Sequence, residues 1–167
     1  TNTNLAAAGG VLAAMLMTQA LYKKVDLTMA LNGALAGLVS ITAGPDLTNH
    51  MMSIVIGGIG GVLVVIAVPL LDKLKIDDVV GAISVHLVAG IWGTLAVGIF
   101  GSGDLRVQII GIVAIGVFVI VTSSIVWLAL KYTIGIRVSD EDEDLGLDMV
   151  ELGLEAYPEF GRGSQRG

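Results

Sequence analysis

The chain has 167 residues, of which 54% are apolar and 14% are charged, and its mean hydropathy is +0.87. These values exclude an ordinary water-soluble domain and favour a membrane protein. The net charge of −6 gives no sign of a nucleic-acid-binding surface, and the absence of cysteine excludes a disulfide framework, a Cys-based zinc site and a thiol nucleophile.

The negative charge is confined to the C-terminal part of the chain. Residues 137–167 carry nine acidic and three basic side chains, whereas residues 1–136 carry six of each. We therefore predict a neutral transmembrane bundle over residues 1–136 and an acidic tail over residues 137–167. Because the chain begins at Thr1 and has no basic segment ahead of Leu5, we expect no signal peptide and a piece of something longer.

Five stretches of the chain contain no Asp, Glu, Lys or Arg, and each has 18 to 24 residues. A helix needs about 20 apolar residues to cross the hydrocarbon layer of a membrane. The stretches take up 103 of the 167 residues, which leaves no room for a soluble domain. We predict an all-α integral membrane protein with transmembrane helices over residues 5–22, 27–44, 51–71, 79–100 and 107–130. The alternative, a buried soluble core, would give shorter helices with a polar face.

Small residues recur in the second and third predicted helices. Gly33 and Gly37 form one GxxxG pair, and Gly57 and Gly61 form another. Lipid gives helices no hydrophobic reason to associate, so close backbone approach at small residues is what allows them to pack. We expect a compact bundle and interpret these glycines as general packing positions rather than as parts of a pore.

The fourth predicted helix follows Asp77 and Asp78 and contains the only histidine within a span. Either carboxylate can accept hydrogen bonds from amides of the first turn. His86 is the eighth of 22 residues, near the membrane midplane, where an ionisable side chain is costly and indicates function. A neutral imidazole has one donor and one acceptor, so it can pass on a polar solute or serve in a proton relay. The alternative is a neutral histidine bonded to a neighbouring Ser or Thr.

Other polar and aromatic side chains have simpler interpretations. Thr42, at the end of the second span, can offer its hydroxyl to a cation that sheds water, but such a hydroxyl also bonds to its own helix. His50 lies in a short connection and is expected to be solvated. Trp92 is expected to pack against another helix in preference to lining a cavity. We predict no enzyme, no catalytic residue, no metal site and no cofactor.

Basic residues in the connections predict the orientation, because they favour the cytoplasmic side. One side carries only Arg106, and the other carries Lys23, Lys24, Lys73, Lys75, Lys131 and Arg137. The chain is therefore predicted to start outside and to place its C-terminus in the cytoplasm. A five-helix unit that begins outside is typical of the second half of an inverted-repeat transporter.

Several runs of sequence resemble the ammonium transporter family. DDVVGAISVHLVAGIWGTLAVGIF, residues 77–100, is similar to the histidine-bearing tenth helix of that family. TNTNLAAAGG at residues 1–10 and LNGALAGLVSITAG at residues 31–44 resemble its seventh and eighth helices. GIRVSDEDEDLGLDMVELGLEAYPEF at residues 135–160 resembles its cytoplasmic ending. These matches cover nearly the whole chain in the right order.

The resemblance implies a fold of eleven transmembrane helices, in which two inverted five-helix repeats precede a long last helix. It implies that this chain is the C-terminal half, helices seven to eleven with the tail, completed by a remaining N-terminal half. It further implies a multi-pass cell-membrane protein that assembles as a homotrimer with one pore per subunit. The implied partners are ammonium or ammonia, the lipid bilayer and a PII-type signalling protein at the tail.

The resemblance also assigns roles to single residues. His86 matches the second of two pore histidines, Thr42 a hydroxyl residue near the outer ammonium-recruitment site, and Leu35 an apolar pore-lining position. Asp78 matches the acid before the histidine helix, and Trp92 lies with it as a structural residue near the pore. A hydrophobic pore of this kind favours ammonia over potassium, because potassium cannot lose a proton and a bare cation is costly in an apolar passage.

Three departures from the family pattern are visible. Leu87 stands where the family has Gly, so added bulk is expected to alter conduction or to widen the helix spacing. Val79 replaces a Pro, and Leu152 and Leu154 replace a His and a Glu of the tail, which weakens the expected PII contact. Two alternatives stay open, an ammonium sensor on the same fold and a non-conducting accessory membrane subunit. Only 31 residues follow Ile136, which disfavours a sensor with its own signalling domain.

Overall fold

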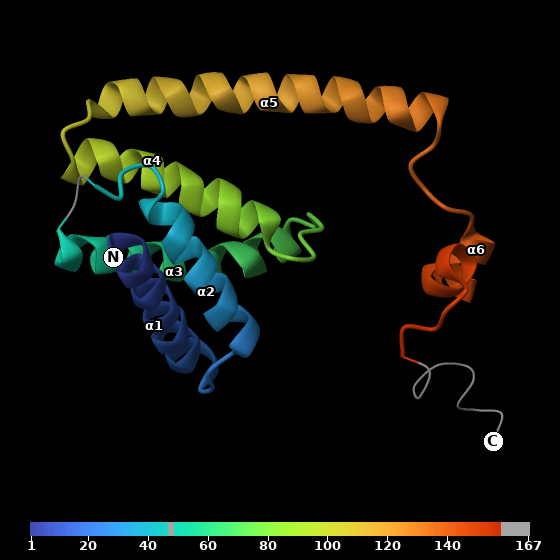
Figure 1. The fold of residues 1–167 in the computed structure, drawn as a ribbon, viewed down its shortest axis with the longest axis horizontal. Helices are drawn as coiled ribbons and strands as arrows, with labels where there is room; N and C mark the ends of the chain where they lie inside the picture. Colours follow the sequence, from blue (N-terminus) through green and yellow to red (C-terminus); the bar gives the residue numbers. More distant parts are fainter. Residues whose placement is uncertain (47–48, 158–167) are drawn as a thin grey trace. The chain divides into compact units, whose positions relative to one another are not determined.

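The computed structural model describes residues 1–46 and 49–157, and every regular element within those ranges is helical. The all-α prediction is thereby confirmed for the part of the chain that is described. The elements in chain order (Figure 1) are α1 Asn2–Tyr22, α2 Leu27–Ile41, α3 His50–Lys73, the π-helix η1 Ala82–Val88, α4 Ala89–Phe100, α5 Leu105–Thr133, α6 Asp140–Leu145 and the π-helix η2 Asp148–Leu152.

The chain separates into two compact units, Thr1–Phe118 and Val119–Gly167, each of which is described by itself. This division falls inside α5, whereas the sequence places the end of the membrane region at residue 136. The last ten residues of the predicted tail, 158–167, lie outside the described residues.

Within the described residues, four helical segments are long and apolar enough to cross a membrane. They are α1, α3, α5 and the continuous run of η1 and α4 from Ala82 to Phe100. The second predicted span is represented by α2, which has 15 residues and ends at Ile41 instead of Gly44. The helices thus overlap all five predicted segments, and α2 is shorter than the sequence predicts.

Side-chain caps explain where two of these helices begin. The carboxylate of Asp26 accepts a hydrogen bond of 2.9 Å from the backbone N–H of Met29 at the start of α2. The amide oxygen of Asn49 accepts one of 2.8 Å from Met52 at the start of α3. Such caps satisfy first-turn N–H groups that have no partner within the helix.

Small residues bring α1, α2 and α3 into close backbone contact, and Figure 1 shows α1 beside α2. A Cβ atom added to Gly10 of α1 would meet the backbone of Gly33 in α2, and one added to Gly61 of α3 would meet the backbone of Gly10. A Cβ on Gly57 would likewise meet Ala6. The expected compact, glycine-dependent packing is confirmed within this unit.

The buried polar side chains of the bundle are satisfied by hydrogen bonds. The hydroxyl of Thr18 donates to the Ala14 carbonyl at 2.9 Å, and that of Ser40 donates to the Ala36 carbonyl at 2.6 Å. These bonds run back along the same helix, so the hydroxyl groups do not force an opening between helices.

Helix α5 differs from the others because it buries no residue. Between Arg106 near its start and Lys131 near its end the helix is uncharged and mostly apolar, and the hydroxyls of Thr122 and Ser123 donate to carbonyls of the same helix. A helix that is apolar all round is typical of a membrane span.

Candidate functional site

The predicted fourth span is not a single α-helix. Residues 79–80 form a turn, a seven-residue π-helix follows over Ala82–Val88, and α4 continues to Phe100. At the start of the π-helix, Gly81 has a φ of 74°, in the left-handed region that favours glycine. π-Helices are rare in proteins, but those that do occur often lie at functional sites. This one carries His86.

The carboxylate of Asp78 holds the first turn of η1. Its Oδ1 accepts a hydrogen bond of 2.9 Å from the Ile83 N–H, and its Oδ2 accepts bonds of 3.0 Å from both the N–H and the hydroxyl of Ser84. The predicted role of Asp78 as a cap is thereby confirmed. Partial burial raises the pKa of the carboxyl, but these hydrogen bonds outweigh it, so the pKa lies below the ordinary value of 3.8.

Replacing Asp78 with alanine is expected to destabilise the native protein by about 1 kcal/mol, as loss of a helix cap does. Because the pKa of Asp78 is lowered on folding, the ionised carboxyl stabilises the fold above pH 3.8, and this stabilisation is lost as the pH falls through the depressed value. Thermal unfolding midpoints at pH 7 and in strong acid measure both effects. Asp77→Ala, at the exposed neighbouring carboxylate, is the matched control and is expected to leave the midpoint at pH 7 unchanged.

His86 lies on the exposed side of η1. Its side chain is exposed, and that of the next residue, Leu87, is 55% exposed. The hydroxyl of Ser84, the nearest hydroxyl along the chain, donates to Asp78 rather than to His86. The imidazole therefore faces away from the packed interior of this unit. Leu87 lies outside the core of this unit, so the expected effect of its bulk on conduction or on helix spacing stays a prediction.

The other predicted pore residues, Leu35 and Thr42, lie on and just after α2. Leu35 is 46% exposed. Thr42 is exposed, and its hydroxyl donates to the Leu38 carbonyl at 2.7 Å, which is the simpler of the two interpretations of this residue. The side chain of Asn32 in α2 lies beside the start of η1, since a Cβ on Gly81 would be 3.3 Å from Asn32 Nδ2.

Trp92 joins α4 to α3. Its Nε1–H donates a hydrogen bond of 3.0 Å to the Ile56 carbonyl, and its ring meets Phe100 edge to face at a centroid distance of 6.3 Å. The expectation that Trp92 packs against another helix is confirmed. Because α4 continues directly from η1, this bond also helps to fix the position of the helix that carries His86.

Replacing Trp92 with phenylalanine is expected to lower the stability of the native protein by about 1 kcal/mol. Most of the aromatic surface is kept, but the hydrogen bond from Trp92 is lost, so the Ile56 carbonyl has one hydrogen-bond partner fewer. The thermal unfolding midpoint should fall. Trp127→Phe in α5 is the control. Because Trp127 is 60% exposed, the unfolding midpoint of this variant should stay near that of the wild type.

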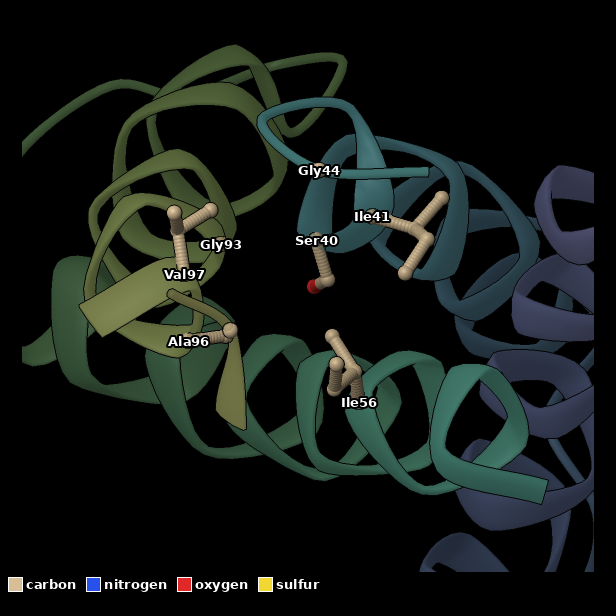
Figure 2. Close-up of a pocket in the computed structure, with 8 residues that line it drawn as sticks. Ser40, Ile41, Gly44, Ile56, Gly93, Ala96 and Val97 are labelled. Atoms are coloured by element: carbon tan, nitrogen blue, oxygen red, sulfur yellow. The ribbon is translucent and has the colours of Figure 1, made fainter. Parts of the chain in front are cut away.

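A small cavity lies between α2, α3 and α4 (Figure 2). Side chains of Ser40, Ile56 and Ala96 converge on it, and its other lining residues are Ile41, Gly44, Gly93, Val97 and Gly101. Its volume of about 10 Å³ is enough for about one water molecule. His86, Leu35 and Thr42 do not line it. It is therefore a packing cavity and not the predicted pore.

Comparisons with known proteins agree on one family. The sequence profile of the Ammonium Transporter Family matches residues 1–157. The chain is 40% identical to the ammonium transporter Amt2 of Archaeoglobus fulgidus, over 95% of this chain and 38% of that protein. It is also 40% identical to the ammonium transporter Amt1 of Haloferax mediterranei, over 95% of this chain and 32% of that protein.

Solved structures give the same result. A protein described as a Sensor Amt Protein matches 90% of this chain and 40% of its own length, with a TM-score of 0.85 and 34% identity. Mep2 of Candida albicans matches 93% of this chain and 39% of its own length, with a TM-score of 0.79 and 30% identity. The chain thus spans less than half the length of these relatives. The matches do not support its placement in the C-terminal half.

Proposed function

Because this chain belongs to the ammonium transporter family, we propose that the native protein containing it conducts ammonium or ammonia across the cell membrane. The chain covers 38% of the Archaeoglobus relative, so the activity is proposed for the whole protein and not for these residues alone. The observation that carries the proposal is His86, an exposed imidazole on a π-helix within a membrane-length segment.

We assign His86 to the wall of the permeation path. An ionisable side chain at this depth is costly unless it faces a cavity or a partner. A neutral imidazole can donate one hydrogen bond and accept another, so it can receive ammonia or a proton without a permanent charge. Leu35 would supply apolar lining, which disfavours a bare cation, and Thr42 a hydroxyl at the outer mouth. Asp78 and Trp92 hold the helix that presents His86.

The assembly and orientation are part of the same proposal. Six basic residues against one favour a cytoplasmic C-terminus and five crossings, α2 among them. We further propose an inverted-repeat fold and a homotrimer with one pore per subunit. The acidic tail would meet a PII-type signalling protein, although Leu152 and Leu154, which are 75% and 72% exposed, replace polar residues of the family pattern there.

Uptake of labelled methylammonium into cells that lack their own ammonium uptake tests the proposal. Expression of the native protein should give saturable uptake that ammonium competes for and potassium does not. Cells that carry the protein in the membrane but take up no more label than the empty control would contradict the proposed function.

A sensor is the second candidate, and one observation favours it. The structural match with a TM-score of 0.85 is to a protein described as a sensor. A sensor would bind ammonium with little flux, so binding without saturable uptake in the same cells would select it.

A further inference from the structure

The π-helix η1 lies between two positions that contacts with other parts of the chain hold in place. At its start, Oδ2 of Asp78 accepts hydrogen bonds of 3.0 Å from the N–H and the hydroxyl of Ser84. Beyond its end, the bond of 3.0 Å from Trp92 to the Ile56 carbonyl holds α4 against α3. The two ends of η1 therefore cannot turn freely relative to each other.

The buried residues of this segment are spaced as a π-helix requires. Ser84 and Ala89 are both 0% exposed, and they lie five residues apart. A π-helix bonds residue i to residue i+5 and so places such a pair one turn apart, whereas an α-helix does this for residues about four apart. In an α-helix the residue one turn after Ser84 would be Val88, which is only partly buried. Between two buried positions η1 thus holds one residue more than an α-turn, and His86 lies within that stretch.

We propose that this additional residue sets the direction in which His86 projects, so that η1 is a positioning element for the imidazole. The inference rests on the proposed function, in which His86 lines the permeation path. One turn over five residues is roughly 72° per residue, and one over four is roughly 90°. His86 is two residues after Ser84, so an α-turn between the same ends would rotate it by roughly 36°.

A rotation of this size matters for a side chain that has to meet a small solute. With the imidazole about 6 Å from the helix axis, the rotation displaces it by about 4 Å. Misplacing a functional group by about 1 Å is enough to lower a rate strongly. The same residue at the same depth would then no longer line the same path.

Deleting Leu87 from the native protein tests the inference. The side chain of Leu87 lies outside the core of this unit, and its removal leaves Ser84 and Ala89 four residues apart, as an α-turn requires. The contacts of Asp78 and Trp92 at the two ends can then still form. We expect a folded protein with a thermal unfolding midpoint near that of Leu87→Ala, which loses the same side chain but keeps the five-residue spacing.

Deleting Leu12 from α1 is the matched control for folding. Leu12 is 58% exposed in this unit and Leu87 is 55% exposed, so the two deletions remove similar side chains. Leu12 lies between the buried residues Gly10 and Ala14 of a regular α-helix, which has no additional residue to give up. Its deletion turns the two halves of α1 by about 100° relative to each other. The midpoint should therefore fall much further than after deletion of Leu87.

Uptake of labelled methylammonium measures the effect on His86. The Leu87 deletion should show a maximal uptake rate about tenfold or more below that of Leu87→Ala, although His86 is present in both. Equal rates in these two variants would overturn the inference and leave the proposed function standing. A fall in the midpoint after deletion of Leu87 as large as that after deletion of Leu12 would overturn it as well. A wild type without saturable uptake would overturn the proposed function and, with it, the role of η1.

Discussion

Replacing His86 with leucine in the native protein is expected to reduce the proposed ammonium flux about tenfold or more. Leucine has no donor or acceptor, so a permeating ammonia, ammonium or proton loses a hydrogen-bond partner in the apolar part of the membrane. Hydrogen bonds to charged partners contribute about 1.5–3 kcal/mol, and a tenfold change in rate corresponds to about 1.4 kcal/mol. Because the side chain is exposed in this unit, its loss should not prevent folding.

Two variants make the His86 experiment specific. His86→Gln keeps a donor and an acceptor but cannot take up a proton near neutral pH, so retained flux in this variant would assign the role to hydrogen bonding. Loss in both variants would assign it to proton transfer. Stopped-flow alkalinisation of proteoliposomes measures the flux, and the thermal unfolding midpoint shows whether each variant is folded. Wild-type flux in folded His86→Leu would show that His86 does not line the path.

Replacing Gly93 with alanine is expected to destabilise the native protein by about 1–3 kcal/mol, the usual cost of overpacking. A Cβ on Gly93 would lie 2.6 Å from the Ser40 carbonyl oxygen and 3.0 Å from the Ser40 Cα atom, so it would press on backbone and not on a movable side chain. The contact between α2 and α4 would have to open beside the small cavity of Figure 2.

Gly90→Ala, three residues earlier in α4, is the control for Gly93→Ala. A Cβ on Gly90 meets only Val39 Cγ1 at 3.8 Å, an ordinary contact, so this variant should have a near-normal unfolding midpoint. A larger fall in the midpoint for Gly90→Ala than for Gly93→Ala would contradict the packing described between α2 and α4.

The helices could be predicted from the sequence because long uncharged apolar runs have few alternatives in a membrane. Their ends were harder to predict. The uncharged run of the second span continues to Gly44, but α2 ends at Ile41, because absence of charge marks what a membrane tolerates and not where helical hydrogen bonds stop. The sequence also could not predict whether the α5 surface is buried against other helices, since an apolar residue can face lipid or protein equally well.

The π-helix that carries His86 was also beyond prediction. Helix type is read from the spacing of polar and apolar residues, and residues 82–88, in which only Ser84 and His86 are polar, are too few to show a period. The local conformation instead depends on Gly81 and on the reach of the Asp78 carboxylate to Ile83 and Ser84. The sequence indicated that Asp78 caps the helix, but not that its carboxylate reaches as far along the chain as Ile83 and Ser84.

For the candidate site, the depth in the membrane predicted from the sequence was sufficient to single out His86, because an ionisable side chain is costly there. The bond from Trp92 to the Ile56 carbonyl depends on how α3 and α4 cross, which no local pattern contains.

We propose that the native protein conducts ammonium or ammonia and excludes potassium along a path lined by His86. Flux into proteoliposomes, measured with matched inward gradients of ammonium and of potassium, tests it most directly. We expect rapid alkalinisation inside the vesicles if ammonia enters, or an inward movement of positive charge if ammonium enters. We also expect no potassium flux above that of empty vesicles, and loss of the ammonium signal in His86→Leu. Equal ammonium signals in protein-containing and empty vesicles would contradict it.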